Sequence, residues 1–327
     1  MNAEGQGTSI APPSSNPESR NVPQRSNLFR RMMDNPVILK ELRGRMRNRQ
    51  AFVLLTVYLG LISLFIVMIY NTLFGITNSV MWDPSVRQTA GKAIFGTVVL
   101  LELVLLSFIA PGLTAGAITA ERERQTYDLL RTTLLSARSL VLGKLGSAFT
   151  YLFLLILTAL PIQSLAFLLG GVGLGEMVAS GVMLVVTAIF YCTLGIFFSS
   201  FMKRTLPATV SSYAAILTSF LILAIIFILI VYLESMGYSS NVPGVAREYI
   251  LISLIWFLIS TNPLMAAAIS EMILVDQQSL FFTTRPIFGS SGPAYLPSPW
   301  LIYVALYFVL TLVMMFWSVY NVKKPER

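Results

Sequence analysis

Long apolar runs divide this sequence into segments that can cross a lipid bilayer as helices. A helix needs about 20 apolar residues to cross the hydrocarbon core. Six runs have about this length or more, and they cover approximately residues 51–74, 93–118, 140–169, 177–201, 206–232 and 300–322. A transmembrane β-barrel would instead show short segments in which apolar and polar residues alternate. The runs therefore predict an all-α membrane protein with six transmembrane helices.

The composition agrees with this class. Of the 327 residues, 55% are hydrophobic and only 12% are charged, whereas a soluble domain averages roughly 25% charged residues. The net charge of +8 could suit nucleic acid, but the basic residues flank apolar runs, so we interpret them as topology signals and expect no nucleic-acid partner. The chain has no histidine and one cysteine, Cys192. We therefore expect no histidine-based triad and no metal site.

The N-terminal region precedes the first apolar run. Residues 1–27 are rich in Pro, Ser and Asn, which predicts a disordered cytoplasmic tail before a single transmembrane domain over residues 28–327. From Asn35 the pattern predicts an amphipathic interfacial helix. Its apolar face is formed by Ile38, Leu42 and Met46, and its cationic face by Lys40 and Arg43. This helix either lies among anionic headgroups or only stops the chain before the first span. Both interpretations place it on the cytoplasmic side.

A charged segment at residues 119–144 separates the second and third apolar runs. Its charged side chains are Glu121, Arg122, Glu123, Arg124, Asp128, Arg131, Arg138 and Lys144. Each charge costs roughly 2.5–3.5 kcal/mol at the centre of a bilayer, so this segment should lie in water. We expect residues 121–131 to extend the second span as a helix, and Ser136 to cap the helix of the third span. The interleaved charges and leucines suggest a surface that another protein holds.

The number of crossings depends on residues 249–275. This run is apolar enough to cross, but Asn262-Pro263 interrupts it and Glu271 lies near its end. If the segment re-enters on the outer side, the chain has six spans and both termini are cytoplasmic; if it crosses, there are seven. Six spans leave more of the 23 Lys and Arg residues inside, as the positive-inside rule prefers. Arg87 and Lys92 then belong to an outer loop.

Glu102 is the unusual polar residue of the second span. A carboxylate inside a membrane usually faces the bundle interior or a partner. Glu102 could line a pathway through the bundle or contact a second copy of the chain, or it could serve helix packing alone. Glu271 lies at the end of the segment that could re-enter, where contact with the outer interface is the simpler interpretation.

Several motifs follow one another in an order that resembles a known family. They are Asn35-Pro36-Val37 with Lys40-Glu41-Leu42-Arg43, Glu121-Arg122-Glu123-Arg124-Gln125-Thr126, Leu129-Leu130, Thr132-Thr133-Leu134-Leu135-Ser136, Leu142-Gly143-Lys144 and Asn262-Pro263-Leu264. Around these spans, the motifs make the chain from Leu28 onward similar to the permease subunits of type-2 ABC transporters. The family usually has Gly where Gln125 stands and Pro where Leu134 stands. Because Gly and Pro break helices, we expect both replacements to stiffen or extend the inner helix.

The resemblance implies a transport role for the chain. It implies an exporter in the cell membrane (plasma or inner membrane), with a second permease copy or paralogue, membrane lipids and a separate ABC ATP-binding subunit as partners. The expected contacts with that subunit are Glu121, Arg122, Glu123, Thr126, Asp128, Leu129, Leu130, Leu134 and Ser136. The chain lacks a Walker-type GxxxxGK[ST] loop. ATP and Mg²⁺ are thus expected in the partner, and this chain is expected to bind no cofactor and not to be an enzyme itself.

Two other function classes are alternatives. One is an ATPase-independent membrane carrier or a membrane scaffold. The other is an intramembrane hydrolase, which the sequence disfavours because Glu121 and Glu123, two residues apart on a helix, project in very different directions.

Overall fold

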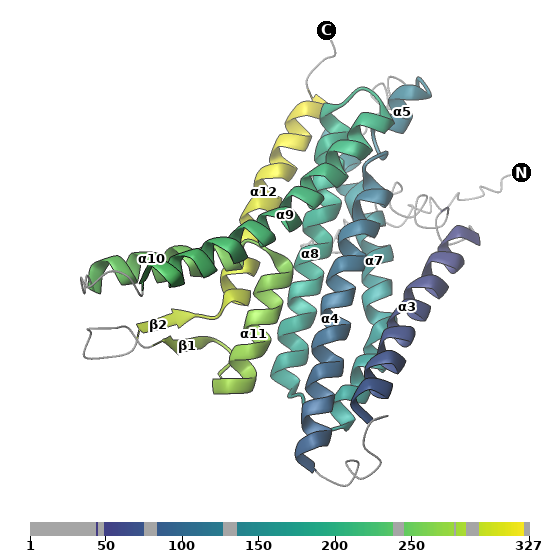
Figure 1. Cartoon of the computed structure of the whole chain (residues 1–327). Coiled ribbons are helices and arrows are strands. Elements are labelled where there is room, and N and C mark those ends of the chain that lie inside the picture. The colour runs from purple at the N-terminus through teal and green to yellow at the C-terminus, as the bar shows by residue number, and fades with distance from the viewer. Residues whose placement is uncertain are drawn as a thin grey trace, which may run out of the picture.

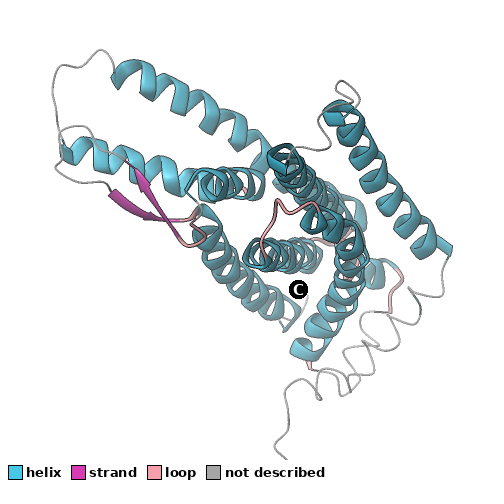
Figure 2. Ribbon diagram, turned by 90° about the horizontal axis from the view of Figure 1, so that it is seen from below, coloured by secondary structure: helices cyan, strands magenta, loops and turns pink. Residues whose placement is uncertain are grey.

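The computed structural model describes residues 44, 49–74, 84–126, 136–237, 245–277, 279–285 and 294–323. Its elements are α3 (Arg49–Phe74), α4 (Pro84–Thr114), α5 (Thr119–Glu123), α7 (Ala137–Leu168), α8 (Leu174–Phe201), α9 (Thr205–Gly237), α10 (Val245–Ser260), α11 (Pro263–Gln277), β1 (Phe282–Arg285), β2 (Ala294–Pro297) and α12 (Pro299–Lys323). Figure 1 shows a bundle of long helices with α5 and the C-terminal end of α12 at one end. Figure 2 shows that α10 and the two strands project away from the bundle.

The long helices have the length and apolar character that a membrane requires. Within the described parts of the chain, six helices can cross a bilayer, or seven if the bent pair α10–α11 forms one span. Their outward surfaces are apolar, with exposed side chains such as Phe52 and Met68 on α3 and Phe308 and Phe316 on α12. Exposed apolar surface of this extent is what lipid contact requires. The chain is therefore a multi-pass α-helical membrane protein.

Helix α8 forms the centre of the bundle and contacts α4, α7, α9 and α12. The core is built from large side chains that are almost fully buried, among them Leu103, Leu106, Leu152, Leu184 and Tyr191. Polar groups inside the bundle find partners within it. The hydroxyls of Thr187 on α8 and Tyr303 on α12 are 2.7 Å apart, and the Tyr307 hydroxyl donates to the Thr261 carbonyl at 2.9 Å. These bonds tie α12 to α8 and to the α10–α11 bend, because no water is available in the hydrocarbon core to replace them.

Glycine allows α8 to approach the end of α4 closely. A Cβ atom added at Gly195 would lie 2.1 Å from Oγ1 of Thr114 and 3.1 Å from the backbone nitrogen of Ala115. No side chain fits in that space. The crossing therefore fixes where α4 ends and where the chain turns toward α5.

The bend between α10 and α11 follows from Asn262 and Pro263. The direction of the chain bends by 117° between the two helices. The Asn262 side-chain oxygen accepts from the backbone nitrogens of Leu264 at 2.9 Å and Met265 at 3.3 Å, while Pro263 takes the first helical position. Both are preferred residues at a helix start. The Asn262 amide also donates to the Ser219 carbonyl of α9 at 2.7 Å. The predicted interruption at Asn262-Pro263 is confirmed.

A short antiparallel hairpin of β1 and β2 was not expected from the sequence. Thr283 pairs with Leu296 in its register. Two indole groups hold the hairpin region to the helices: Trp256 donates to the Pro297 carbonyl, and Trp300 donates to the Leu280 carbonyl, each at 2.7 Å. The apolar pattern around these eight residues is too short to indicate strands, and their pairing depends on the helices on either side.

Some predicted boundaries were wrong. Arg87 and Lys92 do not lie in a loop, because α4 already begins at Pro84, and proline is favoured at the first helical position. The helix thus starts before the apolar run does. Pro111 and Pro161 lie inside continuous helices, because membrane helices accommodate proline when neighbouring groups satisfy the released backbone. The tail 1–27 and the interfacial-helix residues Ile38, Lys40, Leu42, Arg43 and Met46 lie outside the described residues.

The close crossing at Gly195 generates a stability prediction. Gly195→Ala should lower the thermal midpoint of the purified protein in detergent, because overpacking a tight contact typically costs about 1–3 kcal/mol. The matched control is Gly181→Ala on the same helix, where an added Cβ meets nothing within 4 Å. This control should melt at or slightly above the parent temperature. Equal midpoints for the two variants would show that the crossing does not depend on the glycine.

Candidate functional site

The charged segment begins where α4 ends. After Thr114 the chain turns and starts the short helix α5, in which the Ala120 nitrogen donates to the Gly116 carbonyl at 3.0 Å. Ser199 of α8 fixes this start: its hydroxyl oxygen accepts from the backbone nitrogens of Ile118 at 2.9 Å and Thr119 at 3.1 Å. Two otherwise unpaired donors at the beginning of a helix are thus satisfied by a neighbouring span.

Arg122 connects α5 to the end of α8. One guanidinium nitrogen donates to the backbone carbonyls of Ser200 at 3.2 Å and Met202 at 2.7 Å. The last carbonyls of a helix lack partners within it and carry partial negative charge. An arginine there supplies both hydrogen bonds and a complementary charge.

Glu123 makes the opposite contact with the start of α9. Its two carboxylate oxygens accept from the backbone nitrogen and the hydroxyl of Thr205, each at 2.8 Å. A carboxylate is favourable at the positive end of a helix and satisfies a free donor there. Arg122 and Glu123 therefore hold the two sides of the short α8–α9 turn.

Glu121 reaches the third of the neighbouring spans. Its Oε1 atom forms an ion pair with Nζ of Lys144 on α7, at 2.7 Å. Lys144 is only 3% exposed, so this pair is largely removed from solvent on the lysine side. Thus three consecutive charged residues bind three different helices. We call this set of contacts, with that of Ser199, the α5 clamp.

The clamp ends in a sharp turn at Gln125. Its φ of 57° is left-handed, and the nitrogens of Gln125 and Thr126 donate to the carbonyls of Arg122 and Glu121, each at 3.0 Å. This bonding pattern is a Schellman motif, in which the left-handed position usually belongs to glycine. The expected helix over residues 121–131 is therefore wrong in its described part, because α5 ends at Glu123. The glutamine does not stiffen the helix, as we had expected, but adopts the conformation that glycine favours.

Most of the predicted partner contacts divide into two groups. Glu121, Arg122 and Glu123 come together in the α5 clamp and bind this chain's own helices. Thr126 follows them, and its hydroxyl donates to the Glu121 carbonyl at 3.3 Å. Asp128, Leu129, Leu130 and Leu134 lie outside the described residues.

Ser136 was expected to cap the helix of the third span, and this prediction is confirmed. Its hydroxyl oxygen accepts from the Ser139 nitrogen at 3.2 Å at the start of α7. The cap therefore fixes the residue at which the charged segment returns to the bundle.

Glu102 lies far from the clamp, inside the bundle. It is fully buried, and the side-chain amide of Gln163 on α7 donates to both carboxylate oxygens at 3.0 Å. In this arrangement the carboxylate faces α7 of the same chain, rather than lipid. Its distance from α5 makes it a second, separate polar site.

Sequence reasoning missed several partners in these contacts. Gln163, Ser199 and Thr205 were not singled out, and Lys144 was noted only as a charge. Gln163 and Lys144 carry a usable signal, because a polar side chain within an apolar run normally faces a partner inside the bundle. Ser199 and Thr205 carry none, since Ser and Thr are common in membrane helices and bond to their own backbone.

Comparison with known proteins adds no assignment: no protein-family model matches the chain, and no curated protein matches its sequence.

The ion pair of the clamp can be tested by substitution. Lys144→Met should lower the free energy of unfolding by about 1–3 kcal/mol, and with it the thermal midpoint in detergent, because Glu121 loses its partner in a partly buried site. Adding Glu121→Gln to that variant should recover part of the loss. The control is Arg138→Met on the same helix, where the side chain is exposed. If Arg138→Met lowered the thermal midpoint as much as Lys144→Met, the Glu121–Lys144 ion pair would not account for the loss of stability.

Proposed function

We propose that this chain is the membrane-spanning permease subunit of an ATP-driven type-2 ABC exporter, coupled to a separate ATP-binding subunit through residues 119–144. The observation that carries the proposal is the α5 clamp. A charged segment that served only to keep a loop in water would need no specific contacts with the spans. Here Glu121, Arg122 and Glu123 instead fasten the segment to α7, α8 and α9.

The clamp suits the transmission of a movement. A partner that displaces the charged segment would pull on three helices together, through hydrogen bonds and an ion pair rather than through a flexible loop. Because packed helices shift as rigid elements, the displacement reaches the interior of the bundle. In this proposal the ATP-binding subunit supplies the energy, and the clamp passes the motion to the membrane domain.

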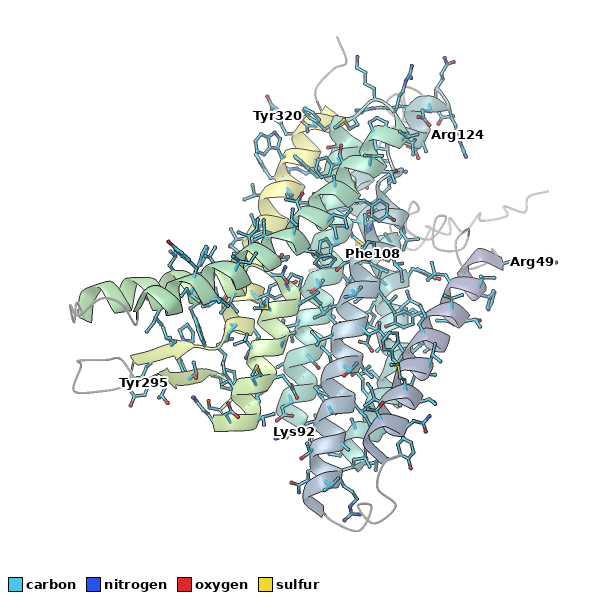
Figure 3. All side chains as sticks on the ribbon, viewed as in Figure 1. Arg49, Lys92, Phe108, Arg124, Tyr295 and Tyr320 are labelled. Atoms are coloured by element: carbon cyan, nitrogen blue, oxygen red, sulfur yellow. The ribbon has the colours of Figure 1, made fainter. Side chains whose placement is uncertain are left out.

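The surface around α5 also supports a cytoplasmic partner. Arg124, Lys203 and Arg204 are exposed and surround the clamp on the α5 and α8–α9 side. Figure 3 shows Arg124 at the same end of the bundle as Tyr320 of α12, and Lys92 at the opposite end. Basic residues collect on the cytoplasmic side of membrane proteins. We therefore propose six spans, with the clamp and the C-terminus in the cytoplasm.

The ATPase-independent carrier remains the second candidate, and one observation favours it. Carriers place polar or ionisable residues near the membrane midplane to bind cargo, and the Glu102–Gln163 pair has this character. The pair is satisfied within the bundle, because the Gln163 amide donates to both carboxylate oxygens of Glu102. For this reason we prefer the coupled permease.

The docking proposal predicts a loss of partner binding on a double substitution. The tagged full-length chain, purified from its native membranes, should retain a Walker-motif ATPase that mass spectrometry identifies. Asp128→Lys combined with Leu129→Ala should abolish this copurification, because it reverses a charge and removes an apolar anchor of the expected contact surface.

Two controls separate docking from folding. Asp276→Lys reverses an exposed charge on α11 and should leave copurification unchanged. Lys144→Met weakens the clamp, so it should keep the ATPase bound while reducing any stimulation of its hydrolysis. Retention of a fully coupled ATPase by the Asp128/Leu129 variant would refute the docking proposal.

The six-span topology predicts the sidedness of cysteine labelling. Cys192 is buried, so single cysteines introduced by Lys324→Cys, Arg124→Cys and Thr284→Cys can be read separately. In intact cells a membrane-impermeant maleimide should label only the Thr284→Cys chain; permeabilisation should expose the other two. Seven spans would reverse the result for Thr284→Cys and Lys324→Cys but not for Arg124→Cys.

A further inference from the structure

A cavity lies between α4, α8, α11 and α12, toward the end of the bundle opposite α5. Its inner chamber has a volume of about 70 Å³ and is lined by Phe95, Val99, Met183, Ser270, Glu271 and Trp300 among others. A wider mouth of about 360 Å³ adjoins it and is lined by Gln88, Lys92, Gly173 and Glu176. Glu176 and Leu274 border both spaces, so the two lie side by side.

Glu271 of α11 lines the chamber together with Glu176 of α8. Its side chain lies against Gly96 of α4, where an added Cβ would be 3.6 Å from the Glu271 Cγ atom. In the part of the chain that the structure describes, no hydrogen bond or ion pair reaches its carboxylate. Lys92 and Glu176 act on it electrostatically, but Lys92 forms no ion pair with it within 4 Å. Glu271 is half-buried, so its carboxylate, which has no donor among the described residues, can accept a hydrogen bond from a ligand in the cavity.

The walls define what such a ligand must be. Phe95 and Trp300 contribute aromatic rings, and the Trp300 indole nitrogen is already bonded to the Leu280 carbonyl, so the ring has no free donor for an anion. Aromatic rings and a carboxylate together favour a cation, and an ammonium group adds N–H donors for the carboxylate. A water molecule needs a cavity volume of only about 10–15 Å³. The chamber, at about 70 Å³, therefore has room for a small headgroup with a short apolar chain.

We propose that this cavity binds a small primary alkylammonium ion, with its nitrogen at Glu271 and its alkyl chain against Phe95, Val99 and Met183. The ion enters from the polar mouth that carries Gln88, Lys92 and Glu176. This site lies at the opposite end from the α5 clamp, and the proposal does not depend on the transport function.

Three ligands that differ mainly in charge test the proposal on the unaltered chain. Radiolabelled n-butylammonium, n-butanol and n-butyrate are equilibrated by dialysis with the full-length protein in an uncharged detergent. Butylammonium should bind saturably at one site per chain, at least tenfold more tightly than butanol, and butyrate should not bind. Equal binding of butanol would show a merely apolar cavity and overturn the proposal. The proposal would also fail if sodium displaced butylammonium as effectively as unlabelled butylammonium does.

Substitution then locates the site. Glu271→Gln should weaken butylammonium binding at least tenfold while butanol binding stays unchanged. The matched control is Asp276→Asn, which removes an exposed carboxylate on the same helix and should leave butylammonium binding unchanged. If both variants bind like the parent, the ammonium does not sit at Glu271 and the proposal fails. The ligand comparison above decides the matter even if the Glu271 variant does not fold.

Discussion

A charged side chain at the edge of an apolar bundle has to find a partner, and the arrangement around α5 is the consequence. Glu121, Arg122 and Glu123 follow one another in sequence, so on a helix they project in three directions. Each direction meets a different span: Lys144 on α7, the last carbonyls of α8, and the first residue of α9. The end of α8 and the start of α9 carry opposite partial charges, so an arginine followed by a glutamate matches the α8–α9 turn in order.

The same requirement organises the interior. Where the helices are apolar, packing sets their distances, as at Gly195 against Thr114. Where polar groups occur, they pair across helices: Glu102 with Gln163, Thr187 with Tyr303, and Asn262 with the Ser219 carbonyl. In a bilayer these pairs cannot be exchanged for water. They therefore determine which helices are neighbours and how each helix is rotated about its own axis. Lipid-facing leucine and phenylalanine side chains cannot determine this.

The two ends of the bundle differ in chemistry. The α5 end is basic at its surface and internally fastened, with Arg124, Lys203 and Arg204 exposed around the clamp. The opposite end has a cavity lined by two carboxylates, Glu176 and Glu271, and no donor of the described chain bonds the Glu271 carboxylate. The first arrangement suits a surface that receives a force from a protein partner. The second suits a small ligand, and α11 is the element that carries it.

Sequence reasoning located most features whose cause is local. The break at Asn262-Pro263 and the cap at Ser136 were predicted because an N-cap residue bonds to nitrogens only two or three positions away. Helix starts such as Pro84 were misjudged, because a helix continues past the apolar run that identifies it. The end of α5 was misjudged as well, since the left-handed φ of Gln125 depends on hydrogen bonds of the whole turn. The hairpin of β1 and β2 depends on Trp256 and Trp300 from other elements.

The sequence alone determined that the chain forms several helices long and apolar enough to cross a membrane. This follows from the cost of transferring side chains and backbone between water and hydrocarbon, which depends on each segment by itself. Only the tertiary structure decided that Glu121, Arg122 and Glu123 bind α7, α8 and α9, and that Glu176 and Glu271, far apart in sequence, line one cavity. Those outcomes depend on which residues distant in sequence meet, and periodicity within one segment carries no record of them.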